Sequence, residues 1–288
     1  NKPPLSREEV ITIRDWISNG APNANGYVKF SDTPNRSKIY VSNQGCDLVA
    51  VFDAKTKSLM RYVDVGNSGA IEVPHSVVVS PDGQFWYADF VGIPYFQKYR
   101  CSDDTKVGEL NLSEVGWHTM SISGNSKYAF AVHWDGNGKV ALIDLTNFSI
   151  VQIYQGGGLF VYPHGSALNQ NGKIGYVTAS SGNFIYKINM ADPYNPDITE
   201  IVLQPGDISN PANEQFKPHQ IGFSPDYSHY FVSCETTNEV RVFNSSNDSL
   251  IAIIPTCKIP EEMSFSTTTP YLFVTSFLDA TTFSPYTG

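Results

Sequence analysis

Charged side chains are scarce in this chain, and cysteines are few. Charged residues make up 16% of the 288 residues, and four residues are cysteines. No two cysteines have the C-x-x-C spacing of zinc ribbons or thioredoxin-like redox pairs, so neither kind of site is expected. The haem attachment signal C-x-x-C-H is also absent. The sequence therefore predicts no haem in this chain.

Basic side chains are outnumbered, and long apolar runs are missing. The chain has 28 acidic and 19 basic residues, which gives a formal net charge of -9. A surface of this sign repels a phosphate backbone, so no nucleic acid partner is expected. No segment approaches the roughly 20 apolar residues that a bilayer-spanning helix needs. The sequence therefore also predicts no membrane span.

A repeated sequence pattern fills most of the chain. Its clearest copy runs from Pro74-His75 to the turn Pro81-Asp82-Gly83, and an apolar strand beginning at Phe85 follows. Related copies begin near residues 27, 74, 117, 163, 218 and 261. The spacing of about 42 to 55 residues lies in the range of blade-type repeats.

Each copy of the repeat predicts two strands joined by a tight turn that is rich in Pro, Asp, Gly or Asn. Two further apolar strands follow, as over residues 48–53 and 59–63. Four strands per unit make one propeller blade. We therefore predict an all-β fold, a β-propeller of four-stranded blades over residues 27–288. Five blades are expected to be whole and a sixth begun, so the last blade is incomplete.

The first 26 residues differ from the repeat and predict one short N-terminal α-helix. Ser6 and Glu9 form a capping box, in which each side chain bonds the other residue's backbone N–H. Ile13, Trp16 and Ile17 form an apolar stripe at helical spacing. A single helix cannot bury its own stripe, so we expect these three side chains to pack against protein. The partner is either the flank of the propeller or a separate domain.

The blade repeat resembles that of YVTN-type propellers. The resemblance rests on the Pro-His-x-x-x-x-Ser-Pro-Asp-Gly line, the Tyr-Val or Phe-Val second strands and the Val-x-Val-Phe-Asp third strand, and it covers residues 27–288. It implies a seven-bladed ring in the parent protein. It also implies a periplasmic or extracellular location, with surface anchoring as a variant. Related architectures include the propellers of nitrous oxide reductase and haem-d nitrite reductases, but the fold alone does not define a function.

The N-terminal segment resembles the last helix of small c-type cytochrome domains. The resemblance rests on the run from Pro3 to Glu9, on Ile13 with Trp16-Ile17, and on Gly20-Ala21-Pro22. It implies that residues 1–26 are the tail of such a domain. A c-type cytochrome domain, or another protein subunit, is therefore an expected partner.

Histidines recur at one position of the repeat, at the start of the innermost strand. Because the first strand of a blade lines the channel, successive copies should place these side chains around one channel mouth. The second strands end on the same face. The predicted metal ligands are His75, His118, His164, His219 and Glu261. The predicted supporting or rim residues are Asp89, His133, Trp134 and Glu235.

The histidine ring predicts a transition-metal site, because neutral imidazole is a ligand for copper, zinc, iron and nickel. Copper is the first expectation, by the resemblance to nitrous oxide reductase. The alternative is structural, with each imidazole capping a turn or bonding a carbonyl of the next blade. The leading function is a metal-binding or redox-associated propeller, and any enzyme activity would be that of a metal-dependent oxidoreductase. A non-catalytic module that binds a protein or a surface is the runner-up, and a hydrolase or lyase built from rim carboxylates is a weaker third.

Overall fold

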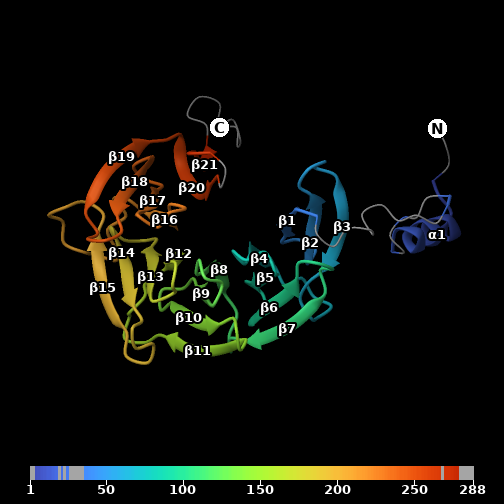
Figure 1. Cartoon of the computed structure of the whole chain (residues 1–288), viewed down its shortest axis with the longest axis horizontal. Helices are drawn as coiled ribbons and strands as arrows, with labels where there is room; N and C mark the ends of the chain where they lie inside the picture. The colour runs from blue at the N-terminus through green and yellow to red at the C-terminus, as the bar shows by residue number, and fades with distance from the viewer. Residues whose placement is uncertain (1–3, 19–20, 22–23, 26–35, 267–268, 279–288) are drawn as a thin grey trace.

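The structure, a computed structural model, describes residues 4–18, 21, 24–25, 36–266 and 269–278. After one helix, the described chain consists of antiparallel β-sheets that follow one another around an arc, with their inner strands toward its centre (Figure 1). The predicted all-β propeller of four-stranded blades is confirmed. No helix among the described residues is long and apolar enough to cross a membrane.

The blades are numbered in chain order, and each sheet pairs consecutive strands. Blade 1 holds β1 (Lys38–Asn43), β2 (Leu48–Asp53) and β3 (Leu59–Asp64). Blade 2 holds β4 (Pro74–Val79), β5 (Phe85–Phe90), β6 (Tyr95–Arg100) and β7 (Lys106–Asn111). Blade 3 holds β8 (Trp117–Ile122), β9 (Tyr128–His133), β10 (Lys139–Asp144) and β11 (Ser149–Tyr154). Blade 4 holds β12 (Pro163–Leu168), β13 (Ile174–Ala179), β14 (Phe184–Asn189) and β15 (Asp197–Val202). Blade 5 holds β16 (Pro218–Phe223), β17 (His229–Cys234), β18 (Glu239–Asn244) and β19 (Leu250–Pro255), and blade 6 begins with β20 (Lys258–Phe265) and β21 (Leu272–Leu278).

Blades 2 to 5 are the whole blades among the described residues. The inner strand predicted for blade 1, at residues 27–31, lies outside the described residues. The inner strands β4, β8, β12, β16 and β20 contact one another in succession. They therefore line the central channel, as the repeat predicts.

The hydrophobic core is divided into layers between neighbouring blades. One layer joins Phe130 and Val132 of blade 3 to Val177 and Tyr186 of blade 4, all buried. Equivalent layers lie between blades 1 and 2, 2 and 3, and 4 and 5. Fully burying one such side chain contributes about 1.5 to 3 kcal/mol. Because each layer needs side chains from both neighbours, the blades stabilise one another.

The N-terminal helix α1 (Arg7–Ser18) has the capping box predicted for it. The Ser6 N–H donates to Glu9 Oε2 at 2.7 Å, and the Glu9 N–H donates to Ser6 Oγ at 3.3 Å. Ile13, Trp16 and Ile17 are 42%, 48% and 58% exposed, so the flank of the propeller does not bury the stripe, and of the two expected partners the separate domain remains a prediction. The helix lies beyond β3, apart from the blades (Figure 1).

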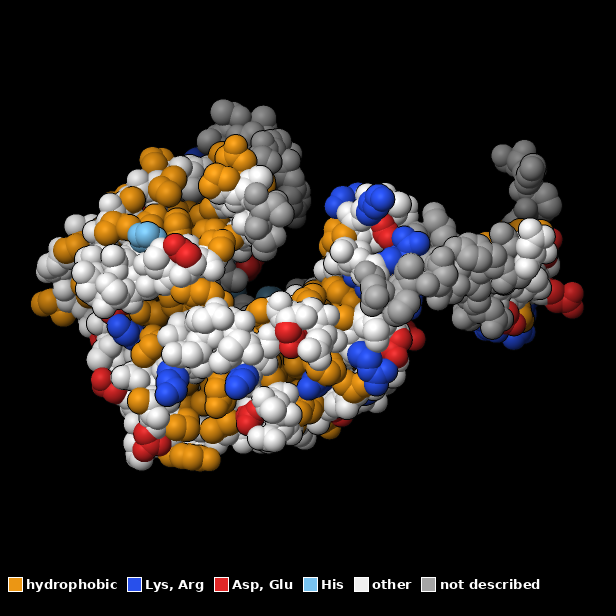
Figure 2. Space-filling model, in the orientation of Figure 1, with side chains coloured by type: hydrophobic (Ala, Val, Ile, Leu, Met, Phe, Trp, Pro, Cys, Tyr) orange, Lys and Arg blue, Asp and Glu red, His pale blue; other side chains and the backbone are white. Residues whose placement is uncertain are grey.

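Charged side chains lie mainly at the surface. On the face shown in Figure 2, acidic and basic groups are interspersed among apolar and uncharged polar side chains. This face therefore carries no single-sign field.

Two aspartates, the buried Asp104 and the partly buried Asp248, tie neighbouring blades together. Asp104 of blade 2 accepts hydrogen bonds from Lys38 Nζ at 2.9 Å and Tyr40 Oη at 2.9 Å, both in blade 1. Trp86 Nε1 of its own blade also donates to it, at 3.2 Å. Asp248 of blade 5 repeats the arrangement with a second tyrosine and lysine, Tyr176 and Lys187 of blade 4, at 2.8 and 2.5 Å. Each aspartate therefore links two blades through charge-assisted hydrogen bonds.

We predict that Asp104→Ala lowers the free energy of unfolding by about 3 to 5 kcal/mol, because it leaves the buried Lys38 ammonium without its counter-ion. The Lys38 and Asp104 side chains are 4% and 1% exposed. Asp103→Ala is the matched control, since Asp103 is 46% exposed and pairs with the half-exposed Arg100. That variant should lose about 1 kcal/mol or less. Urea unfolding measures both, and equal losses would contradict the assignment.

Candidate metal and ligand site at the channel mouth

Each inner strand begins with a β-bulge that carries the channel residue. The pairing register shifts directly after Pro74, Trp117, Pro163, Pro218 and Pro260. His75, His118, His164, His219 and Glu261 are the next residues in these strands. A bulge leaves one residue out of the ladder and re-aims its side chain. Because of the bulges, the channel side chains do not follow the alternating directions of the other side chains in their strands.

The residue two positions before each channel residue has a left-handed backbone. These residues are Val73, Gly116, Tyr162, Lys217 and Ile259, with φ of 60°, 99°, 45°, 48° and 54°. A non-glycine residue in this region costs about 1 to 3 kcal/mol and needs support from its surroundings. The carbonyl of Tyr162 accepts from Ser180 N at 2.9 Å, and that of Lys217 from Glu235 N at 3.2 Å. These bonds hold the residues that follow the second strands beside the histidines.

The carbonyl of every channel residue bonds the preceding blade. The donors are Ser42 Oγ to His75, His75 Nδ1 to His118, Thr119 Oγ1 to His164, Thr178 Oγ1 to His219, and Ser233 Oγ to Glu261. A buried carbonyl must find a donor. The five bonds therefore fix the channel residues at matching heights around the axis.

The four histidines lie in a row from blade 2 to blade 5. Ring centroids are 5.0 Å apart between His75 and His118, 6.4 Å between His118 and His164, and 4.0 Å between His164 and His219. The structure thus brings the four predicted imidazoles into a continuous file. Their role as metal ligands stays a prediction.

Two of these rings have a defined tautomer. His75 Nδ1 bonds the His118 carbonyl, and His118 Nδ1 bonds the Gly116 carbonyl at 3.0 Å. A carbonyl only accepts, so Nδ1 carries the proton in both rings. Burial lowers the pKa of each ring, which keeps it neutral near pH 7. Nε2 is therefore left with a lone pair in His75 and in His118.

His164 and His219 are more strongly shifted. Burial, followed by the charges of neighbouring histidines, lowers the pKa of His164 to about 3. Burial lowers the pKa of His219 to about 4. Their buried Nδ1 atoms have no hydrogen-bond partner within the described residues. Both rings are therefore neutral at pH 7, the form that a metal ion binds.

Among the described residues, one set of three side chains could hold a metal ion. His219, Glu235 and Glu261 each offer an atom, and these atoms lie within 4.8 Å of one another. His219 Nε2 is 3.8 Å from Glu235 Oε1. Burial raises the pKa of Glu235 and of Glu261, and a neighbouring carboxylate adds to each shift. Glu235 was expected to support a ligand from the rim, and here it faces the same point as the ligands.

The other predicted rim residues take separate places. Asp89 is fully buried and accepts from Ser76 N at 2.9 Å, so it fastens the bulge of its own blade. His133 is 7% exposed and meets the edge of Trp117. Trp134 is the exposed rim residue, at 43%, and its ring lies 5.5 Å from that of His118.

A pocket of about 570 Å³ opens over this row. Its walls include His118, Trp134, Tyr162, His164, His219 and Glu235. Sequence reasoning did not select Tyr162 or Lys217, which also line it. Both precede a Pro-His pair, and that position in the repeat is the signal that could have identified them.

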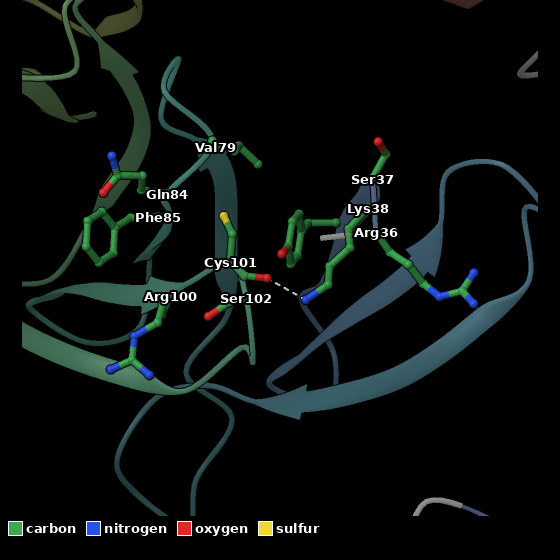
Figure 3. Close-up of a pocket in the computed structure, with 11 residues that line it drawn as sticks. Arg36, Ser37, Lys38, Val79, Gln84, Phe85, Arg100, Cys101 and Ser102 are labelled. Carbon is green, nitrogen blue, oxygen red and sulfur yellow. Dashed lines mark hydrogen bonds between the residues drawn. The ribbon is translucent and has the colours of Figure 1, made fainter. Parts of the chain in front are cut away.

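A larger cavity, of about 730 Å³, lies elsewhere, between blades 1 and 2 (Figure 3). Its cationic side chains already have partners: Arg36 pairs with Asp53 at 2.7 Å, Lys38 with Asp104, and Arg100 with Asp103 at 2.6 Å. Lys38 Nζ also donates to the Cys101 carbonyl, as Figure 3 shows. The channel mouth is therefore the better candidate site.

Comparisons with known proteins support the fold. Neither a known family nor a curated protein matches the sequence. The structure is similar to Kuenenia stuttgartiensis hydrazine synthase, with a TM-score of 0.70 and 17% identity over 85% of this chain and 78% of that one. A functionally unknown protein from Desulfotomaculum acetoxidans gives 0.64, with 13% identity over 86% and 77%. A chain of the mitotic checkpoint complex gives 0.65, with 13% identity over 84% and 68%. Likeness at this level shows the fold and no function.

We predict that Thr178→Val lowers the free energy of unfolding by about 1 to 3 kcal/mol, because two backbone groups lose their partner. The buried Thr178 hydroxyl accepts from Gly165 N at 2.8 Å and donates to the His219 carbonyl at 2.9 Å. Thr199→Val is the control, since Thr199 is an exposed residue of an outer strand. Its effect should stay within about 0.5 kcal/mol. A silent Thr178 variant in chemical denaturation would refute the role given to the hydroxyl.

Proposed function

We propose that this propeller binds a divalent transition-metal ion at the channel mouth, through His219, Glu235 and Glu261. The observation that carries the proposal is the meeting of one imidazole and two carboxylates within 4.8 Å. The side chains come from the inner strand and the end of the second strand of blade 5, and from the inner strand of blade 6.

The electrostatics of this group favour a cation. Two carboxylates that face one point repel each other. Burial raises the pKa of Glu235, and the charge of Glu261 adds to that shift; burial, followed by the charge of Glu262, raises the pKa of Glu261. A bound ion would replace the repulsion with attraction. The His219 ring is neutral at pH 7, so it needs no deprotonation before binding.

The donor set bears on the choice of metal. One nitrogen and two oxygen ligands suit zinc or iron(II) as well as copper(II), and three protein ligands leave positions open for water or a further ligand. The other imidazoles of the row lie next to the group and supply further nitrogen donors. We propose zinc as the first ion to test and copper(II) as the second.

We predict that wild-type protein stripped with EDTA binds one equivalent of zinc and that His219→Ala weakens this binding at least tenfold, since an imidazole ligand is lost. Glu235→Gln should weaken it similarly while keeping the side-chain shape. His229→Ala is the matched control. His229 is the first residue of β17, and Glu235 follows the last, so His229 lies on the face of the propeller opposite the metal group. Competition with a chromophoric chelator gives the affinities, and equal binding by all four proteins would overturn the proposal.

The same titration carried out across pH tests the ligand assignment. Protons compete with the ion, so affinity falls as pH falls through the ligand pKa values. Burial raises the pKa of Glu235 and of Glu261 above the ordinary glutamate value, whereas the pKa of His219 is about 4, so the carboxylates take up protons before the imidazole as pH falls. Zinc binding should therefore be complete at pH 8 and lost by pH 4, and binding that persists at pH 4 would contradict this ligand set.

A second candidate function is protein binding through α1. Its apolar side chains are exposed, which favours a protein partner for the stripe. We propose that this partner is a c-type cytochrome domain. We also propose that the propeller is of YVTN type. Its proposed location is the periplasm or the outside of the cell. These proposals rest on the sequence resemblances. Cell fractionation tests the location.

We predict that Ile17→Asp weakens binding to a purified c-type cytochrome domain at least tenfold in calorimetry, since it places a charge in the apolar stripe. Ile11→Asp is the matched control. Ile11 lies about 200° around the helix from Ile13 and therefore off the stripe. Binding that is insensitive to Ile17→Asp, or no binding by the wild type, would leave the metal site as the sole proposal.

A further inference from the structure

The channel-mouth pocket has an aromatic wall. The rings of Trp134 and Tyr162 have centroids 5.3 Å apart and are 43% and 39% exposed. The largest aromatic side chains of the blades, such as Trp86, Trp117 and Tyr87, are buried in the layers between them. The two exposed rings therefore contribute little to the core and present flat apolar surface to the pocket.

This wall is held rigid by its own hydrogen bonds. Trp134 Nε1 donates to Ser180 Oγ at 3.3 Å, and Ser180 Oγ donates to the Tyr162 carbonyl at 2.7 Å. Trp134 N also donates to the Gly116 carbonyl at 3.1 Å, and Tyr162 N to the Asp135 carbonyl at 2.8 Å. The backbone that carries each ring is therefore already ordered in the absence of a ligand, which reduces the conformational entropy lost on binding.

The remaining walls are rich in acceptors. The Ser180 hydroxyl proton is used by the Tyr162 carbonyl, and that of Ser181 by the Pro211 carbonyl at 2.7 Å. His118 Nε2 carries a lone pair, because its Nδ1 donates to a carbonyl. Glu214 and Glu235 add carboxylates. A ligand that satisfies these walls must bring hydrogen-bond donors.

The charge of the pocket narrows the ligand class further. Lys217 Nζ lies 3.9 Å from Glu214 Oε2 and 3.9 Å from Glu235 Oε2. An anionic ligand would meet two carboxylates against one ammonium. A cationic ligand between Glu214 and Glu235 would meet the Lys217 ammonium there, whereas the proposed metal group uses the other Glu235 oxygen, Oε1, which lies 3.8 Å from His219 Nε2. A neutral molecule is repelled neither by the two carboxylates nor by the Lys217 ammonium.

We infer that this pocket binds a neutral, hydroxylated aromatic molecule, with its ring stacked on Trp134 and Tyr162 and its hydroxyl groups directed at Glu214, Glu235 and His118. The volume of about 570 Å³ lies in the range of small-molecule sites and admits a ligand of two fused rings. The aromatic site shares the pocket with the proposed metal group. It does not depend on the ion.

The test uses 2,3-dihydroxynaphthalene as probe and the full chain stripped with EDTA, so that binding is measured without metal. The probe should bind the wild type, and Trp134→Leu should weaken binding about tenfold because the stacking surface is lost. Trp16→Leu is the matched control, since Trp16 is similarly exposed, at 48%, on the helix apart from the blades (Figure 1). Its affinity should stay within about twofold of the wild type.

Two analogues with the same rings test the ligand class. Naphthalene-2-carboxylate and 2-(aminomethyl)naphthalene should each bind about tenfold more weakly than the diol. The inference is overturned if the metal-free protein does not bind the diol, if Trp134→Leu binds it as well as the wild type, or if either charged analogue binds as tightly. Zinc binding by His219→Ala is measured separately. If the diol does not bind as expected, the metal proposal still stands, and if zinc does not bind as expected, the proposal of an aromatic ligand still stands. Thermal unfolding followed by circular dichroism establishes that Trp134→Leu is folded.

Discussion

The structure depends on a hydrogen bond that crosses from each blade to the next at the channel. In every described blade pair, the carbonyl of the channel residue accepts a hydrogen bond from a side chain of the preceding blade. Side-chain packing alone would let neighbouring sheets slide, because apolar contacts are non-directional. A hydrogen bond between a fixed donor and a fixed carbonyl is directional, so it prevents the sheets from sliding. The blades therefore share one register, and the side chains at the mouth share one height.

The left-handed residue two positions before each channel residue turns this register into a site. In blades 2 to 5 its carbonyl accepts a hydrogen bond from the N–H of the residue that follows the second strand. Glu235 and Trp134 come to the mouth in this way, since their own N–H groups make the bonds. The site is thus built from two points of each repeat: the start of the inner strand and the residue after the second strand. The strain at Lys217 or Tyr162 is offset by the bonds that it makes possible.

Much of this arrangement could be predicted from the sequence, and the limits have physical causes. The Pro-His repeat gave the blades, the inner strands and the file of four imidazoles, because period-two strands and turn residues are local signals. It did not distinguish a residue of the candidate metal group from one that supports the strand. Asp89 is the penultimate residue of β5 and Glu235 follows the last residue of β17, so two repeat positions separate a residue inside the ladder from one beyond it. The exposure of Ile17 could not be predicted from the sequence either, because an apolar stripe predicts a helix but does not identify the surface against which it packs.

The ties between blades have a consequence for how such a face can change. At the position of the histidines, blade 6 carries Glu261, and its carbonyl is still held by Ser233. The bond to each channel residue uses its main-chain carbonyl, and among the channel residues only His75 also acts as a donor, through Nδ1 to the His118 carbonyl. At His118, His164, His219 and Glu261 the ties between blades therefore place no demand on the side chain. Those positions can exchange their side chains, and so change the chemistry presented at the mouth, without breaking the bonds that join the blades.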